Sequence, residues 1–269
     1  MLTLAVVLTV VGGLVAFVAG PLVLADWIHA RRRETIARQI AVTDAIHGEL
    51  GAVVAPVVTR RLGGPWEVIP NGVLVPDEAE PGGREHTITF AGRHEPRKGL
   101  QVLIRAWPEI RRHTGLRLRV VGADPLAVRL LLSRLRVPDE GIDVLGFLSQ
   151  EELTDALRAT KALVAPSLGG ESFGMVLTRA FACATPVVAS DIPGYREVVT
   201  PQTAVAVPPG DVDALADAVE LLVADEPGRA AMGAAARELA VGRYAWADIA
   251  RRLEMVYVRV VDGRQAVAA

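Results

Sequence analysis

The stretch "GESFG", residues 170–174, matches the G-x-S-x-G pattern of the α/β-hydrolase nucleophile elbow, in which a serine attacks an ester. The partners of such a serine follow it in the chain, and the last of them is a histidine. All five histidines of this sequence precede Ser172, and the last is His113. Leu168 and Gly169 also separate the motif from the preceding apolar run, where an elbow would follow its strand directly. The sequence therefore argues against a nucleophilic role for Ser172.

The same residues suit the binding of an anion by the backbone. Gly169 and Gly170 lead into an expected helix that starts at about Ser172. Free amides at a helix N-terminus favour negative charge, and glycines let a phosphate come close to the backbone. An ordinary loop leading into a helix would show the same pattern, so the motif alone leaves both interpretations open.

A second cluster lies in "GRHEPRKGL", residues 92–100, where a predicted strand gives way to a helix. Arg93, Arg97 and Lys98 place three cations in this turn. Arginine binds phosphate in a bidentate way and lysine acts as a point charge, although a solvated basic turn is the alternative. Together with the lone acid Glu171, the cations predict a sugar-nucleotide site. We expect the cations to take the diphosphate and Glu171 the sugar hydroxyls.

Short β-branched runs alternate with helical patterns through the second part of the chain. The predicted strands cover residues 87–92, 116–122, 142–146, 162–167, 185–190 and 204–210. The predicted helices cover residues 99–113, 124–136, 149–159, 173–184 and 211–224, and two more follow. Ser149 and Glu152 form a capping box. This alternation predicts a doubly wound α/β domain from about residue 85 to 262, a parallel sheet covered on both faces that binds ligands at the carboxyl ends of its strands.

The composition limits the function classes. The formal net charge of −2 gives no basic field of the kind that attracts nucleic acid. The single cysteine, Cys183, excludes an intrachain disulfide and a multi-cysteine metal site, so a reducing, cytosolic setting is the simplest interpretation.

Before the α/β domain, "WEVIPNG", residues 66–72, predicts a short buried strand that ends in an Asn-Gly turn. The Pro- and Gly-rich, acidic residues 73–86 predict a linker.

The first segment predicts a membrane anchor. No charged residue occurs from Leu2 to Ala25, which is long enough for a transmembrane helix, and Arg31, Arg32 and Arg33 follow it. By the positive-inside rule we expect a single-pass anchor with everything after Arg31 in the cytoplasm. A signal peptide cleaved after Ala25, or a strand and helix of a soluble domain, are the alternatives.

Three stretches carry a family resemblance: "GRHEPRKGLQVLIRAW", "APSLGGESFGMVLTRAFACATPVVASDIPGYREVV" and "VIPNG" resemble the family-4 glycosyltransferases of the GT-B fold. "LGGESFG" and the late "RYAWADIARRLEMVY" resemble the bacterial phosphatidylinositol mannosyltransferase branch. The resemblance covers about residues 35–262 and implies that residues 85–262 are the Rossmann-like, C-terminal donor-binding domain. It further implies retaining transfer of a hexose from GDP-mannose or a UDP-hexose to a lipid or glycan acceptor, with no metal or other cofactor.

The resemblance also assigns roles to residues of this chain. The matching Arg93 and Lys98 hold the donor diphosphate, and Glu171 contacts the transferred sugar. The backbone of residues 172–174 lies against the sugar and phosphates, and residues 146–148 lie near the nucleobase. We therefore expect Glu171, Arg93 and Lys98 to be catalytic, and the donor-binding residues to be Asn71, Gly72, Gly92, Gly122, Phe147, Leu148, Gly170, Ser172, Phe173, Gly174 and Arg179.

The sequence departs from the family pattern in three ways. The family carries a ribose-binding glutamate eight positions after the first one, and here that position is Arg179, a donor that reaches a phosphate or is simply solvated. Ala184 replaces a glycine. Only residues 31–84 resemble a remnant of the N-terminal GT-B domain and its linker, so we expect a lost or mis-set front half, or a separate chain that supplies the acceptor domain. A non-catalytic donor-binding domain is the alternative to an active transferase, and a GT-B epimerase is a weaker one.

Overall fold

The computed structural model describes residues 69–77 and 83–268, all of which belong to one compact unit. The expected transmembrane helix, residues 2–25, lies outside the described residues, as does most of the expected remnant at 31–84. Within the described ranges no helix is both long and apolar enough to cross a membrane.

The described unit is built on a single six-stranded sheet with the order β3-β2-β1-β4-β5-β6, and every neighbouring pair is parallel. From β1 the chain moves outward through β2 to β3, and then returns to the other side of β1 as β4. Between β1 and β4 the strand order therefore reverses, which is the position where open α/β sheets bind ligands. The strands are Thr87–Ala91, Arg117–Val121, Ile142–Gly146, Ala162–Ala165, Val187–Ser190 and Ala204–Val207 for β1 to β6.

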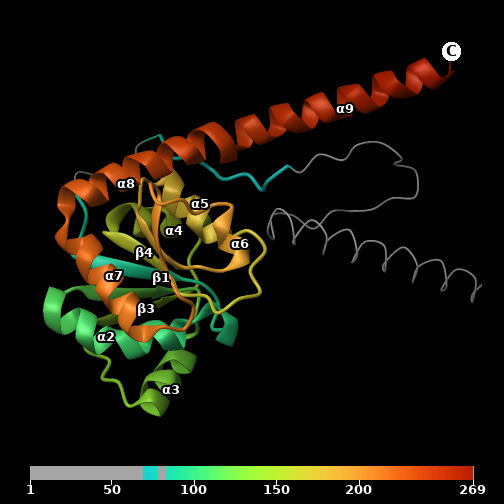
Figure 1. Cartoon of the computed structure of the whole chain (residues 1–269). Coiled ribbons are helices and arrows are strands. Elements are labelled where there is room, and N and C mark those ends of the chain that lie inside the picture. Colours follow the sequence, from blue (N-terminus) through green and yellow to red (C-terminus); the bar gives the residue numbers. More distant parts are fainter. Residues whose placement is uncertain (1–68, 78–82, 269) are drawn as a thin grey trace, which may run out of the picture. The chain divides into compact units, whose positions relative to one another are not determined.

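Two hydrophobic cores cover the two faces of the sheet. In β4, Ala162 and Val164 belong to one core and Leu163 and Ala165 to the other, because successive side chains of a strand point to opposite faces. The first core packs against α2 (Leu100–Thr114), α3 (Pro125–Leu135) and α7 (Val212–Ala224). The second packs against α4 (Gln150–Ala159), α5 (Met175–Ala182) and the segment around Tyr244. Figure 1 shows the sheet between these two layers. The predicted doubly wound domain is confirmed.

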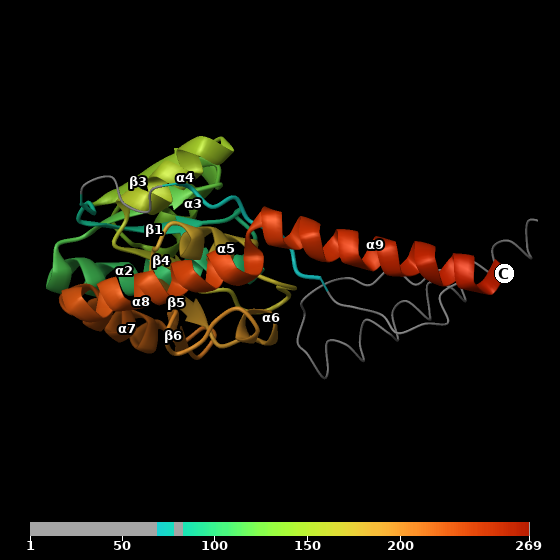
Figure 2. The ribbon, with the colours of Figure 1, turned by 90° about the horizontal axis from the view of Figure 1, so that it is seen from above.

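Four of the helices, α2, α3, α4 and α7, match their predicted intervals to within one residue at each end. Ser149 forms the expected capping box with Glu152, in which each side chain bonds the other residue's backbone N–H. A short 3₁₀ turn, η1 (Pro96–Lys98), and the short helix α6 were not predicted. Figure 2 shows the chain ending in the long helix α9. The α-helices are Leu100–Thr114, Pro125–Leu135, Gln150–Ala159, Met175–Ala182, Pro193–Arg196, Val212–Ala224, Glu226–Leu239 and Trp246–Ala268 for α2 to α9, and a π-helical segment, Ala240–Tyr244, joins α8 to α9.

Two predictions about local structure were wrong. Helix α5 begins at Met175 and not at about Ser172, because Gly174 takes a left-handed conformation with φ of 73° and interrupts the helical path. The second wrong prediction concerns the strand expected at residues 66–72, because residues 69–72 form no strand. Their neighbour Val73 pairs instead with the end of the π-helical segment, where its N–H donates to the Tyr244 carbonyl at 2.7 Å. Residues 66–68, the first three of the predicted strand, lie outside the described residues.

Candidate functional site

The loop after β1 and the loop after β4 meet where the strand order reverses. The Leu168 N–H donates to the Arg97 carbonyl at 2.7 Å and joins the two loops through their backbones. Gly99 makes this approach possible, since a Cβ there would lie 1.7 Å from the Pro166 carbonyl oxygen. Its φ of 73° also favours glycine. The two motifs singled out in the sequence are therefore brought together at the carboxyl edge of the sheet.

Glu171 is the centre of the cluster that results. Its side chain is only 8% exposed, and its Oε1 lies 2.6 Å from Arg97 Nη1 and 2.7 Å from Lys98 Nζ. Arg97 Nη1 also donates to the Gly170 carbonyl at 3.0 Å. Within the described residues, every polar contact of this carboxylate goes to Oε1. The second oxygen, Oε2, can therefore accept a hydrogen bond from a ligand hydroxyl.

Arg93 belongs to the same charged cluster but does not contact Glu171. Its Nη2 lies 2.9 Å from Glu95 Oε1, and its side chain is 70% exposed. Glu95 Oε2 lies 2.7 Å from Arg97 Nε, so Glu95 bridges the two arginines. The cluster joins three cations to two carboxylates, so one positive charge is in excess. Such an arrangement can attract and hold a polyanion such as a diphosphate.

A buried layer supports Glu171 from behind. Helix α6 packs directly on its backbone, since a Cβ on Gly194 would lie 1.8 Å from the Glu171 carbonyl oxygen. The next residue, Tyr195, is buried and shares a 2.8 Å hydrogen bond with the buried Ser167. Burial raises the pKa of the Tyr195 phenol, so the phenol stays protonated and keeps this hydrogen bond at neutral pH.

The sequence analysis assigned no role to the supporting residues Ser167, Gly194 and Tyr195. Arg97 was recognised as a cation, but its contact with Glu171 depends on how close the two loops come. Gly194 and Tyr195 lie in "DIPGYREVV", a part of the long family motif, and that motif was the available signal. The pairing of Ser167 with Tyr195 had no signal, because it joins residues from two separate loops.

The predicted glycines of the first strands lie at the same edge. Gly122 packs against Gly92, whose carbonyl oxygen would be 3.1 Å from a Cβ on Gly122. The Gly122 N–H donates to the Gly146 carbonyl at 2.6 Å. Just beyond β3, Phe147 is 74% exposed and Leu148 is half-buried. An exposed aromatic ring at this edge can stack on a flat ligand group, and its proposed role at the nucleobase stays a prediction.

The remaining residues of "GESFG" divide between surface and core. Ser172 is exposed, whereas Phe173 is buried with its ring edge-on to Tyr244 at a centroid distance of 5.5 Å. Gly170 has a φ of 67°, and a Cβ there would be 3.5 Å from Arg97 Cδ. Gly174 lies against the Tyr195 ring, which a Cβ would approach to 2.8 Å. The motif thus supplies a shaped backbone and one carboxylate, and no nucleophile.

Three further predicted residues lie apart from the Glu171 cluster. Arg179 is half-buried in α5, and among the described residues its guanidinium has no hydrogen-bond or ion-pair partner. Asn71 is exposed. Gly72 lies beneath the Trp246 indole, where a Cβ would come within 2.4 Å of the ring. The structure thus gives Gly72 a packing role at the start of α9, and its role in donor binding stays a prediction.

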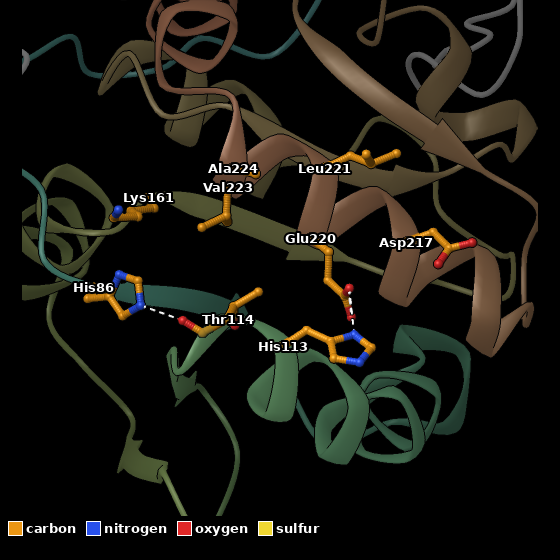
Figure 3. A pocket seen from close by; sticks show the side chains of 9 residues that line it. All are labelled: His86, His113, Thr114, Lys161, Asp217, Glu220, Leu221, Val223 and Ala224. Atoms are coloured by element: carbon orange, nitrogen blue, oxygen red, sulfur yellow. Dashed lines mark hydrogen bonds and ion pairs between the residues drawn. The ribbon is translucent and has the colours of Figure 1, made fainter.

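The hollow drawn in Figure 3 lies at the opposite edge of the sheet. It encloses about 560 Å³ and is lined by residues that precede β1 and β4, such as His86 and Lys161. His113 Nδ1 and Glu220 Oε2 form a 2.8 Å contact across the α2–α7 junction at its wall. Because ligands of open α/β sheets bind at the carboxyl ends, we place the site at the Glu171 cluster and not in this hollow.

The described ranges contain no group of three or more His, Cys, Asp or Glu side chains that could hold a metal ion. The charged groups of the Glu171 cluster are instead two arginines, one lysine and two glutamates. The Cys183 thiol is buried, and burial raises its pKa to about 11. A thiol of this kind is protonated and unreactive at neutral pH.

Comparison with known proteins agrees with this geometry. Residues 85–225 match the family model described as glycosyl transferases group 1. The chain belongs to this family. The match covers both loops of the Glu171 cluster, so the cluster lies inside the glycosyltransferase domain.

Among the relatives of this group 1 glycosyltransferase is the phosphatidyl-myo-inositol mannosyltransferase of Mycobacterium leprae, which is 36% identical over 226 residues, 78% of this chain and 59% of the relative. A GDP-mannose-dependent mannosyltransferase of Corynebacterium glutamicum, which acts on a monoacylated phosphatidylinositol monomannoside, is 34% identical over 62% of this chain and 45% of its own length. The sucrose-phosphate synthase structure from Thermosynechococcus elongatus has a TM-score of 0.63 and 27% identity, covering 73% of this chain and 53% of that one. The chain therefore spans less than two thirds of the relatives described here.

Proposed function

We propose that the described domain binds the nucleotide-sugar donor of a retaining hexosyltransferase, which passes the hexose to a lipid or cell-envelope glycan. The observation that carries this proposal is the Glu171 cluster. A buried carboxylate, held by Arg97 and Lys98, lies where the strand order reverses and beside an excess of positive charge. Membership of the glycosyl transferases group 1 family supports a sugar donor as the ligand.

In the proposed mechanism the cations act on the leaving group. As the bond between sugar and diphosphate breaks, negative charge grows on the diphosphate, and fixed cations stabilise it most at that moment. Lys98 and Arg93 provide this charge from the loop after β1. Glu171 Oε2 accepts a hydrogen bond from a hexose hydroxyl and orients the sugar. We propose that no metal or other cofactor is required, an expectation that rests on the family resemblance.

For the donor we propose GDP-mannose, with a UDP-hexose as the alternative. The printed names of the relatives from M. leprae and C. glutamicum both describe mannosyltransferases, and the second names GDP-mannose. Both names also describe a phosphatidylinositol-type acceptor. We therefore propose a lipid acceptor of this chemical class.

We further propose that the chain is anchored in a membrane with the donor site in the cytoplasm. The uncharged run from Leu2 to Ala25 and the three arginines that follow it support this topology. An anchor would keep the donor site beside a lipid acceptor, on the side of the bilayer where sugar nucleotides are made.

A second candidate function is donor binding without transfer by this chain alone, with a separate chain supplying the acceptor domain. Arg179 favours it. This guanidinium stands where the family resemblance implies a ribose-binding glutamate, and a cation cannot accept hydrogen bonds from ribose hydroxyls.

A transfer assay separates the two functions. Detergent-solubilised full-length chain would be incubated with radiolabelled GDP-mannose or UDP-glucose and phosphatidylinositol vesicles, and label in the lipid phase would be counted. We expect transfer from one donor and a loss of at least a hundredfold in Glu171→Gln. Glu140→Gln, which removes an exposed carboxylate paired with Arg111 elsewhere, should keep wild-type activity. Donor binding without any lipid labelling would support the second candidate, and full activity in Glu171→Gln would refute the proposed role of that residue.

A further inference from the structure

The loop after β1 carries a carboxylate that the proposed mechanism does not use. Glu95 Oε1 lies 2.9 Å from Arg93 Nη2, and Glu95 Oε2 lies 2.7 Å from Arg97 Nε. Its side chain is 30% exposed, so the bridging carboxylate is partly withdrawn from water. One carboxylate thus occupies donors of two of the three cations in the cluster.

The fold of the loop does not depend on this carboxylate. Glu95 precedes the 3₁₀ turn η1, but its side chain makes no capping hydrogen bond. Backbone groups hold the turn instead: the Lys98 N–H donates to the Glu95 carbonyl at 2.9 Å, and the Gly99 N–H to the Pro96 carbonyl at 3.2 Å. The Glu95 side chain therefore contacts guanidinium groups and not the backbone of the turn.

A carboxylate between two guanidinium groups makes the same charge-assisted N–H···O bonds that phosphate oxygens make. Arg93 is the most exposed cation of the cluster, and it follows the carboxyl end of β1 in the chain. A diphosphate bound by Arg93, as proposed above, would lie beside an Arg93 Nη2 and an Arg97 Nε that Glu95 already contacts. A diphosphate that binds there therefore competes with Glu95 for these two guanidinium groups.

We propose that Glu95 sets the affinity of the site for diphosphates: it occupies Arg93 and Arg97 when no diphosphate is bound and is displaced by the diphosphate of the donor. The same competition favours release of the nucleoside diphosphate after transfer, because Glu95 re-forms its contacts as the product leaves. This inference rests on the proposed function, since it takes the cation cluster to be the diphosphate site.

The test is calorimetric titration of the full-length chain with inorganic pyrophosphate, UDP and GDP. Glu95→Gln and Glu95→Ser each remove the carboxylate and leave the backbone bonds of η1 in place, so that two variants guard against a folding defect in one of them. We expect both to bind pyrophosphate, and the nucleoside diphosphate that wild type prefers, about three- to tenfold more tightly. Their affinity should also fall more steeply with salt, because Arg93 loses its carboxylate partner and the net positive charge of the cluster rises by one. Glu140→Gln, with the same change of charge at the Arg111 pair, should bind as wild type does.

The outcomes distinguish this inference from the proposed function. Tighter pyrophosphate binding by both Glu95 variants, with no binding of either nucleotide, would support the role of Glu95 and refute the nucleotide-sugar site. Nucleotide binding by wild type with unchanged or weaker binding by the Glu95 variants would refute the role of Glu95 and leave the proposed function standing. A folded chain that binds none of the three ligands would refute both.

Discussion

Gly99 shows how one residue can decide whether the site forms. The loop after β1 carries the cations and the loop after β4 carries Glu171, and the two backbones come so close that no side chain fits between them. A Cβ on Gly99 would meet the Pro166 carbonyl oxygen at 1.7 Å. The close approach in turn lets Arg97 reach both Glu171 and Gly170.

Gly99→Ala should therefore lower the free energy of unfolding by about 2–4 kcal/mol, through the left-handed φ and the steric clash together. Urea denaturation followed by circular dichroism measures this loss. Gly146→Ala is the matched control, because Gly146 has a similar φ of 68° but no atom within 4 Å of its Cβ position. The control should lose only about 1 kcal/mol, and equal losses in the two variants would show that the contact with Pro166 does not matter.

Lys98 offers a clean test of the donor site, because the chain has only one other lysine, Lys161. Lys98→Ala should weaken binding of the nucleotide sugar at least tenfold, about 1.4 kcal/mol, since it removes a cation 2.7 Å from Glu171. Lys161→Ala, at the opposite edge of the sheet, should leave the dissociation constant unchanged. Equal affinities for wild type and Lys98→Ala would exclude Lys98 from the site.

At the scale of elements, Arg84 forms hydrogen bonds at the C-terminal ends of two helices, α4 and α5, that cover the second face of the sheet. Its guanidinium donates to the Thr160 carbonyl after α4 at 2.8 Å and to the Ala184 carbonyl after α5 at 2.8 Å. A further bond reaches the Thr185 hydroxyl at 3.0 Å. Helix carbonyls at these ends lack partners within their own helices, so a single arginine satisfies both ends.

Arg84→Met should lower the free energy of unfolding by about 2–4 kcal/mol, because partly buried carbonyls lose their donors. Chemical denaturation is again the measurement. Arg117→Met removes an exposed arginine that pairs with Asp143 and should unfold at nearly the wild-type denaturant concentration. A wild-type midpoint for Arg84→Met would show that water replaces the guanidinium at no cost.

Cys183, at the end of α5, makes the stability depend on pH in the alkaline range. Burial raises the pKa of its thiol from the ordinary value of 9.0 to about 11. Below pH 9 the thiol is protonated in both states, whereas between pH 9 and 11 only the unfolded chain forms the thiolate. The contribution of the Cys183 thiol to the free energy of unfolding is thus fully present below pH 9. It falls by about 2–3 kcal/mol as the pH rises to 11.

The comparison is between wild type and Cys183→Ala, each unfolded by urea at several values from pH 8 to 11. The free energy of unfolding of wild type should fall more steeply with pH than that of the variant. Parallel curves would show that the thiol is accessible to solvent in the folded chain.

At the scale of the whole molecule, the sequence was sufficient for the fold but not for the inner geometry of the site. Alternating apolar runs and helical periods located all six strands, because that alternation reflects burial on both faces of a parallel sheet. The start of α5 was misplaced because Gly174 adopts a left-handed conformation that no periodicity reveals. Residues 69–72, the described part of the strand expected at 66–72, form no strand, because β-propensity does not show whether a partner strand is available.

The candidate site was predicted in the same partial way. Glu171 and Lys98 do come together, since both follow strands that flank the reversal of strand order. The sequence did not indicate that Arg97 contacts Glu171, or that Arg93 pairs with Glu95. The Arg97–Glu171 contact joins two loops that are more than seventy residues apart in the chain, and the Arg93–Glu95 contact depends on the side-chain geometry within one loop.

The central claim is that the Glu171 cluster binds a nucleotide sugar, and calorimetric titration of the full-length chain with GDP-mannose, UDP-glucose and UDP-N-acetylglucosamine tests it most directly. We predict that one of these donors binds with a dissociation constant in the micromolar range, and that Lys98→Ala weakens this binding at least tenfold while Lys161→Ala does not. Absence of binding by a chain that unfolds cooperatively, or equal binding by wild type and Lys98→Ala, would contradict the claim.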